Sequence, residues 1–381
     1  MEVYFDNSAT TKAYDEVCED MSLAMKEYYA NPSSLHKLGL KCQRRLMEAR
    51  ENIAKSINAS KEELLFTSGG SESNNTVLRG LAKKGNHIIT TVFEHPSVLL
   101  TCKELEEKGV RVTYLKHDSM GRIDLNELEN SIIKDTVLVS IMHVNNEIGT
   151  ISDIAAISKV IRAKSQRAKF HIDGVQGYGK FGVDVKKLDI DFYSMSAHKI
   201  HGPRGIGFLY MRKDLNVSSL ISGGSQEFGH RAGTENIAAI VGMEKACEIT
   251  LENIDKSMEN VVELKAYFVE RLKEIKDIRI NSPIEEFISS YILNVSFVGA
   301  RAEVILHLLE DSDIFVSTGS ACSSKKVISK GSHVLNAIGL KPNEIEGAIR
   351  FSFSGENTKD EVDHTIEALK KSLTFLRRFK R

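Results

Sequence analysis

The sequence lacks the cysteine pattern of a disulfide-rich or zinc-binding protein. It has only five cysteines in 381 residues, and none of them forms a C-x-x-C pair. Scattered cysteines argue against a disulfide framework and a structural metal site, and they favour a reducing compartment. A net charge of −1 gives no overall field that would attract nucleic acid. We therefore expect no metal and no direct binding of nucleic acid.

Long apolar runs and an export signal are also absent. No run approaches the roughly 20 residues that span a bilayer, and the start, Met-Glu-Val-Tyr-Phe-Asp, has no basic region followed by an apolar one. These absences predict a cytoplasmic protein without a membrane segment. The chain is 41% hydrophobic and 27% charged, as is ordinary for a globular enzyme, and its length favours two domains.

Apolar runs alternate with helical patterns between about residues 40 and 215. The runs with strand character are Glu63–Thr67, His87–Thr91, Arg111–Leu115, Val137–His143, Lys169–Asp173, Ile190–Ser194 and Ile206–Tyr210. The helical patterns are Gln43–Ile57, Ser73–Lys83, Val98–Lys108, Leu125–Ile132 and Ile154–Lys164. This alternation predicts an α/β fold with a mainly parallel, seven-stranded sheet, in which ligands bind at the carboxyl ends of the strands.

The pattern changes after this region. One long amphipathic stretch, Leu251–Ile275, is followed by strand-like Ile292–Phe297, helical Arg301–Leu309 and strand-like Ile314–Ser317. Strand-like Ala348–Phe353 and a closing helix at Lys359–Phe375 complete the chain. We predict a large domain at residues 13–258 and a smaller α+β domain formed by residues 1–12 and 259–381.

Two residues indicate the chemistry. Lys199 follows the extended segment Ile190–Ser196, so its amine should lie at the mouth of the sheet, where it could hold a carbonyl cofactor as a Schiff base. Cys322 lies in a polar segment, Ser-Thr-Gly-Ser-Ala-Cys-Ser-Ser, of the kind that allows a thiol to move. Together they predict a bound cofactor and a nucleophile that removes an atom from the cofactor's ligand.

Other polar residues at strand ends fit such a cofactor, although each has a simpler interpretation. Gly69 and Gly70 lead from a strand into a helix, which could form a phosphate cradle or merely a capped helix start. Asp173 could hold a ring nitrogen protonated or cap a turn before glycine. His95 could stack on a flat ring and move protons, or be structural. Two amides, Asn146 and Gln176, could bond a ring hydroxyl.

Ordered motifs along nearly the whole chain resemble those of the cysteine desulfurases, the pyridoxal-phosphate enzymes of aminotransferase class V. The motifs are Phe5-Asp-Asn-Ser-Ala-Thr-Thr, Asn31-Pro-Ser-Ser, the Gly69 loop, Glu94-His, Met142-His-Val-Asn-Asn-Glu, His171-Ile-Asp, Ser196-Ala-His-Lys, Arg231-Ala-Gly-Thr-Glu-Asn, Gly319-Ser-Ala-Cys and Ile349-Arg-Phe-Ser. The resemblance implies a fold-type I pyridoxal-phosphate transferase and a homodimer.

The resemblance also implies a role for each candidate residue. Lys199 would carry pyridoxal 5'-phosphate and act as the base at the substrate Cα, while His95 would stack on the ring and assist proton transfer. The remaining cofactor contacts would come from Asp173, Gln176, Asn146, Gly70, Ser71, Ser196 and His198, with Thr234 from a partner subunit. Arg350 would bind the substrate carboxylate, helped by Asn31.

Cys322 would perform the step that distinguishes this family. Its thiolate would attack the sulfur of bound L-cysteine, releasing L-alanine and leaving a persulfide on Cys322. A thiol needs a proton acceptor or a positive field to ionise at pH 7, and His95, Lys325 and Lys326 are candidates. The polar residues after Cys322 resemble the long-loop group of the family, which passes sulfur to an acceptor protein.

Several residues depart from the family's usual pattern. Gly223-Gly-Ser-Gln-Glu-Phe228 lacks one glycine and one arginine, Gly174 stands where alanine is common, and Ser8 and Ser71 replace alanine and threonine. The chain also stops soon after its last helix, whereas relatives that load an iron–sulfur scaffold often have a longer tail. The acceptor is therefore expected to be either such a scaffold or a tRNA or cofactor thiolation enzyme.

Two other classes of function stay open at this point. Another class V enzyme, an aminotransferase or a selenocysteine lyase, would use Lys199 and Asp173 but would not need Cys322. A degenerate scaffold that only binds partners would be expected to lose Lys199, Asp173 or Arg350, and all three are present.

Overall fold

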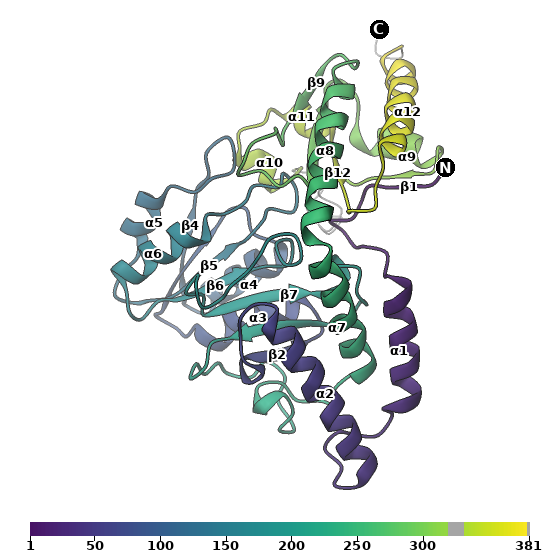
Figure 1. The fold of residues 1–381 in the computed structure, drawn as a ribbon. Coiled ribbons are helices and arrows are strands. Elements are labelled where there is room, and N and C mark those ends of the chain that lie inside the picture. Colours follow the sequence, from purple (N-terminus) through teal and green to yellow (C-terminus); the bar gives the residue numbers. More distant parts are fainter. Residues whose placement is uncertain (319–330, 379–381) are drawn as a thin grey trace.

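The computed structural model describes residues 1–318 and 331–378, which form two units of secondary structure joined by a long helix (Figure 1). The larger unit contains a seven-stranded sheet in the order β2-β8-β7-β6-β5-β3-β4. Only β8 (Gly207–Met211) runs antiparallel to its neighbours, β2 and β7. The predicted mainly parallel, seven-stranded sheet is confirmed.

The strands of this sheet lie close to the predicted runs. They are β2 (Leu64–Thr67), β3 (His87–Thr91), β4 (Arg111–Leu115), β5 (Thr136–Met142), β6 (Lys169–Asp173), β7 (Phe192–Ser196) and β8. All residues of β2, β3, β7 and β8 are buried, and so are the last four residues of β6. This burial is expected for strands that helices cover on both faces.

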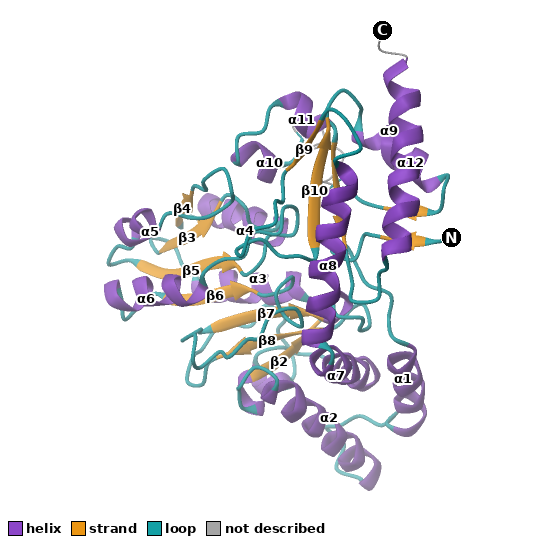
Figure 2. Ribbon diagram, turned by 45° about the horizontal axis from the view of Figure 1, so that its top comes forward, coloured by secondary structure: helices purple, strands orange, loops and turns teal. Residues whose placement is uncertain are grey.

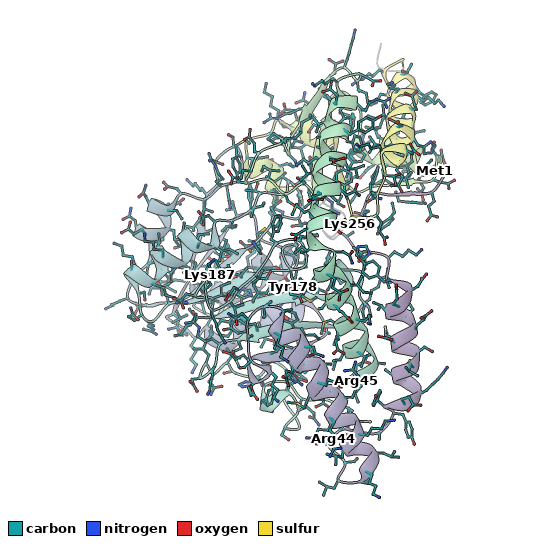
Figure 3. The ribbon with its side chains drawn as sticks, viewed as in Figure 1. Met1, Arg44, Arg45, Tyr178, Lys187 and Lys256 are labelled. Carbon is teal, nitrogen blue, oxygen red and sulfur yellow. The ribbon has the colours of Figure 1, made fainter. Side chains whose placement is uncertain are left out.

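Helices cover both faces of this sheet (Figure 2). They are α2 (Lys37–Lys55), α3 (Gly70–Leu81), α4 (Pro96–Glu107), α5 (Leu125–Ser131), α6 (Ile154–Lys164) and α7 (Ile237–Glu252), while α1 (Asp15–Glu27) packs on α7. The core between the layers includes Tyr178, whose ring meets Phe208 edge-on and whose hydroxyl is 2.7 Å from the Ser56 hydroxyl (Figure 3). The sequence analysis did not anticipate α1, in which only Val17 and Ala24 are buried.

Most of the amphipathic stretch Leu251–Ile275 is helical, but it is divided between two helices. Leu251 belongs to the end of α7, and a new helix, α8 (Ile254–Leu272), begins after Asn253. The backbone of Asn253 leaves helical geometry (φ −105°, ψ 10°), and its side-chain amide donates to the carbonyl oxygen of Ile249. The apolar spacing continues across this break, so periodicity alone could not locate it.

The smaller unit contains a three-stranded antiparallel sheet in the order β12-β10-β9 and a two-stranded parallel sheet of β1 and β11. Its elements are β1 (Val3–Tyr4), β9 (Ile278–Ile280), β10 (Ile292–Phe297), α9 (Ala302–Glu310), β11 (Ile314–Phe315), α10 (His333–Ala337), α11 (Pro342–Glu346), β12 (Ala348–Ser352) and α12 (Lys359–Arg378).

The N-terminus folds back onto this smaller unit. Val3 and Phe5 are fully buried in a core formed otherwise by residues between Val261 and Leu373. Phe5 meets Phe353 edge-on with a ring separation of 5.2 Å. A separate core fills the space around the seven-stranded sheet. No helix within the described residues is long and apolar enough to cross a lipid bilayer.

Candidate active site

A cavity of about 210 Å³ opens at the carboxyl ends of the strands of the large sheet. Ten of the predicted site residues line it: Gly70, Ser71, His95, Asn146, Asp173, Gln176, Ser196, His198, Lys199 and Arg350. They come from six separate segments between residues 70 and 350, so the fold gathers them from most of the chain. This juxtaposition is what makes the cavity a candidate active site.

Lys199 ends a short 3₁₀ turn, Ala197–Lys199, that directly follows β7. Its amine donates to the carbonyl oxygen of Ala9 at 2.8 Å and also to that of Ser8. Lys199 borders both this cavity and a second polar hollow on its other side. The amine is therefore held between two chambers by the N-terminal segment.

Asp173 ends β6, and its carboxylate is held from two directions. The side-chain amide of Asn74 donates to Oδ2 at 2.7 Å, and the backbone N–H of Val175 donates to Oδ1 at 3.1 Å. Asp173 and Asn74 are 5% and 1% exposed. A fixed, buried carboxylate at the floor of the cavity suits a positively charged ring nitrogen.

The opposite end of the cavity is built for an anion. Helix α3 begins at Gly70, which lines the cavity. The backbone N–H groups of its first turn have no partners within the helix, so they can bind an anion. Ser71, Ser196 and His198 border the same place, and an adjoining open hollow of about 350 Å³ extends it towards Arg204. Burial and the nearby cations Lys199 and Arg204 lower the pKa of His198 to about 4, so His198 is a neutral hydrogen-bonding group here.

Gln176 has both ends of its amide engaged. Its Nε2 donates to the carbonyl oxygen of Ser8 at 2.8 Å, and its Oε1 accepts from Lys180 at 2.9 Å. Lys180 is buried next to Lys199 and Arg350, and burial followed by these two charges lowers the pKa of Lys180 to about 7. Sequence reasoning missed Lys180, although it stands one helical turn after Gln176, the spacing at which two side chains meet.

His95 is the N-cap residue of α4, and its ring accepts a hydrogen bond from the backbone N–H of Ser97. Burial lowers the pKa of His95; the charges of Lys199 and His333 act in the same direction, and that of Asp173 opposes them. Sequence reasoning also missed Ser97, which contacts the ring, and Asn74, which contacts the Ser97 hydroxyl. The signal for Asn74 was its place at the end of the glycine–serine motif that starts α3.

Arg350 lies on β12, an outer strand of the three-stranded sheet, and reaches the cavity from the other side. Its Nη2 donates to Asp6 at 2.8 Å and its Nη1 to the carbonyl oxygen of Asn146 at 2.9 Å, while Nε is buried without a partner among the described residues. The side chain is 5% exposed. The guanidinium is thus both salt-bridged and part of the cavity wall.

Two predicted residues of the described chain do not line the cavity. Asn31 is exposed between α1 and α2, where its side chain accepts from the backbone N–H of Ser33. Thr234 is exposed in the segment before α7. Cys322, with its neighbours Lys325 and Lys326, lies outside the described residues; Ser317, shortly before it, lines the cavity and pairs with Arg350.

One departure from the family's usual pattern has a steric explanation. A methyl group on Gly174 would lie 1.9 Å from Cζ of Tyr193, because the tyrosine ring fills that place below the cavity floor. The Tyr193 hydroxyl donates to the carbonyl oxygen of Gly174 at 3.3 Å. The Tyr193 ring therefore leaves room for no side chain larger than that of glycine at position 174.

The second departure, at Phe228, creates a local contact. Phe228 adopts φ +57° and is 48% exposed, with the guanidinium of Arg50 at 5.1 Å from its ring. Arg50 forms a bidentate, buried ion pair with Glu227. The segment is thereby anchored to α2 of its own chain.

Comparisons with known proteins agree with this arrangement. The profile of the aminotransferase class-V family matches residues 3–365. The cysteine desulfurase IscS of Dictyoglomus turgidum is 44% identical over 99% of this chain and 95% of its own length. The corresponding protein of Clostridium botulinum is 42% identical over 97% of this chain and 94% of its own length. A solved NifS-like protein superposes with a TM-score of 0.92 and 38% identity, covering 98% of this chain and 100% of that one.

Proposed function

The chain belongs to the aminotransferase class-V family and, within it, to the cysteine desulfurases, and we propose that it converts L-cysteine to L-alanine and passes the sulfur, as a persulfide on Cys322, to an acceptor protein. The observation that carries the proposal is one cavity that gathers Lys199, Asp173, His95 and Arg350 in a chain matched almost end to end by these enzymes.

The residues present fit pyridoxal 5'-phosphate. Three side chains of the cavity, Ser8, Asn74 and Arg350, each have a buried polar atom without a hydrogen-bond partner among the described residues, so the walls have bonding capacity to spare for a polar ligand. An amine, a carboxylate and a helix start suit its aldehyde, ring nitrogen and phosphate. When bound, the cofactor joins the substrate amine and accepts the electron pairs released at the substrate carbons.

Each end of the cavity would then hold one part of the cofactor. Asp173 keeps a proton on the ring nitrogen, because the ionised carboxylate, fixed by Asn74, favours the positive charge. The amides at the start of α3, with Ser71, Ser196 and His198, bind the phosphate. Gln176 and Asn146 would bond the ring hydroxyl, and His95 would stack on the ring.

The substrate is held by the opposite wall. Arg350 binds the substrate carboxylate beside Asp6, which already fixes the plane of the guanidinium. Lys199 removes the proton from the substrate Cα as a neutral amine and returns it later, a task for which its place between two polar chambers is suited.

Cys322 completes the reaction. Its thiolate attacks the sulfur of bound cysteine, so that a sulfur–sulfur bond forms and the Cβ–sulfur bond breaks. The electron pair of the broken bond goes to the carbon fragment, which takes up a proton and leaves as alanine. The two sulfur atoms stay on Cys322 as a persulfide, and no external oxidant is needed.

The partners and location are part of the same proposal. Thr234 is exposed and outside its own cavity, which supports a homodimer in which it serves the partner's cofactor. Exposed apolar side chains around the α1–α2 connection, including Met25, Tyr29 and Leu35, support a second copy there. The four described cysteines are all free thiols, which supports a cytoplasmic location.

The first test is stoichiometric. The purified protein, incubated with L-cysteine and a reductant, is expected to release alanine and sulfide in equal amounts, and Cys322→Ala is expected to release neither. Cys18→Ala is a matched control, because Cys18 is exposed and its loss should leave both products unchanged. Turnover in Cys322→Ala would move the enzyme to the selenocysteine lyases or aminotransferases.

The acceptor is tested separately, by sulfur transfer from cysteine labelled with ³⁵S. An iron–sulfur scaffold and a tRNA thiolation enzyme would be offered in parallel to the persulfide form. Label on one of them assigns the acceptor class, whereas label on neither contradicts transfer to these partners.

A further inference from the structure

The ring of His95 receives two hydrogen bonds on one nitrogen. The backbone N–H of Ser97 donates to Nδ1 at 3.1 Å, and the Ser97 hydroxyl lies 2.8 Å from the same atom. A backbone amide can only donate, so Nδ1 has to be an unprotonated acceptor. The single proton of a neutral ring then lies on Nε2.

The direction of the Ser97 hydroxyl is fixed by two further residues. The Asn74 amide donates one hydrogen to Ser97 Oγ at 2.9 Å and the other to Asp173 Oδ2 at 2.7 Å. An ionised carboxylate only accepts, so Asp173 fixes the Asn74 amide with its NH₂ group towards both partners. Since Ser97 Oγ accepts from Asn74, it directs its own hydrogen to His95 Nδ1.

The surroundings of the ring also oppose a second proton. His95 caps the N-terminus of α4, where the positive end of the helix dipole disfavours an imidazolium. Burial lowers the pKa of His95, helped by Lys199 and His333 and opposed by Asp173. Burial raises the pKa of the neighbouring Glu94 to about 8, so Glu94 adds no negative charge near pH 7.

We propose that Asn74 and Ser97 are positioning residues that hold His95 as a neutral ring with its proton on Nε2, which makes His95 a hydrogen-bond donor towards the cavity. Nε2 has no hydrogen-bond partner among the described residues, and His95 lines the cavity. Neutral histidines at helix N-termini act as such donors in other enzymes. This differs from the sequence expectation that His95 moves protons.

The identity of the acceptor rests on the proposed function: it is the sulfur of bound cysteine. A hydrogen bond from Nε2 orients this sulfur and withdraws electron density from it, which favours its attack by the Cys322 thiolate. The ring neither gains nor loses a proton in this role, so its state is the same before and after turnover. The proton acceptor for the Cys322 thiol then has to be a group other than His95.

The test observes the ring directly. In holoenzyme labelled with ¹⁵N-histidine, the ¹⁵N signals of His95, assigned by their loss in His95→Gln, report which nitrogen carries a proton. Wild type is expected to show a neutral ring protonated on Nε2 between about pH 6 and 8, the range in which histidines commonly titrate. Ser97→Ala removes one donor to Nδ1 and is expected to raise the pKa of His95; Asn74→Ala should act in the same direction, but less.

Thr101→Val is the matched control. Thr101 lies one turn further along α4, and its hydroxyl donates to Asn75 and to the carbonyl oxygen of Ser97, without contact to the His95 ring. Its loss should leave the ¹⁵N signals of His95 unchanged. A proton on Nδ1, or a charged ring at neutral pH, in wild type would overturn the proposal. An unchanged ring in Ser97→Ala would remove Ser97 and Asn74 from it.

Kinetics test the donor role separately. Gln places an NH₂ group near the position of Nε2, so His95→Gln is expected to keep roughly two- to tenfold more activity than His95→Ala, the value of one hydrogen bond to a neutral atom. Equal losses would contradict the donor role. A protein with the predicted ring state that forms no alanine from cysteine would contradict the proposed function while supporting the state of His95.

Discussion

The two sheets that meet at the cavity contribute different chemistry. The seven-stranded sheet provides the residues proposed to hold the cofactor, including Asp173 at the end of β6 and Lys199 after β7. The three-stranded sheet provides Arg350, which pairs across to Ser317 shortly before the segment that contains Cys322. The cofactor is thus assigned to one unit, and the substrate carboxylate and the proposed sulfur carrier, Cys322, to the other.

This difference predicts two kinds of effect in variants, one on the bound cofactor and one on substrate binding. Groups at the ends of parallel strands are held by a rigid frame, and Asp173 and Gln176 are each held by two hydrogen bonds with their own unit or the N-terminal segment. Arg350 is fixed instead by contacts with Asp6 and Asn146 that bring the units together. Variants on the large sheet should change the cofactor's absorbance, and variants on the small sheet should change substrate binding.

The largest effect is expected at Lys199. Lys199→Ala removes the amine that binds the cofactor and acts as base, and alanine formation should fall by roughly a thousandfold or more. The visible absorbance of the holoenzyme should change in parallel. Lys187→Ala is the control, because Lys187 is exposed on the surface and should alter neither (Figure 3). Unchanged absorbance in Lys199→Ala would place the cofactor elsewhere.

Arg350→Gln, in the smaller unit, should weaken substrate binding. Loss of a hydrogen-bonded charge is expected to lower kcat/KM for cysteine by about ten- to a hundredfold, mainly through KM, with the cofactor absorbance unchanged. Arg301→Gln offers a comparison, since Arg301 lies in the same unit with a 63% exposed side chain. Loss of cofactor with an unaltered KM would contradict the division between the two sheets.

A third effect concerns the floor of the large sheet. Gly174→Ala should reduce the free energy of unfolding by roughly 1 to 3 kcal/mol, because its methyl group would overlap the Tyr193 ring. Tyr193→Leu combined with it should recover part of this loss in denaturant titrations. Gly182→Ala, where a methyl group would meet nothing within 4 Å, is the control. A fully stable Gly174→Ala protein would show that the floor is less rigid than we infer.

The smallest effect compares one buried lysine from each unit. Burial lowers the pKa of both Lys180 and Lys265 to about 7 from 10.5. Between pH 7 and 10.5 the unfolded chain binds a proton at each that the folded chain does not, so each makes stability rise with pH, by about 1 kcal/mol between pH 7 and 8.

Substitution should separate the two lysines by their contacts. Lys265 donates to the carbonyl oxygens of Pro283 and Ser289, so Lys265→Met should flatten the pH dependence of stability without changing kcat. Lys180→Met should flatten it equally and also lower activity, since Lys180 holds Gln176. Lys256→Met, at an exposed position, should change neither. Equal effects of the two substitutions on kcat would contradict the inference that the contact between Lys180 and Gln176 supports activity.

The sequence predicted most of the sheet because a strand buried on both faces is a short, nearly continuous apolar run. Lys169–Asp173 and His87–Thr91 were placed to the residue. The helix break at Asn253 was missed because it interrupts the backbone and not the apolar spacing. Helix α1 was missed because most of its side chains are exposed and carry little periodic signal.

The sequence by itself determined the reaction type, because its ordered motifs match those of one enzyme family and include Lys199, Asp173 and Arg350. Only the tertiary structure decided what surrounds those groups. It brought Asn74 and Ser97, 23 residues apart, into one hydrogen-bonded chain between Asp173 and His95, and it set Tyr193 against Gly174. Sequence motifs show which chemical groups are present. The position of the proton on His95 depends instead on which hydrogen-bond donors the fold places next to its ring.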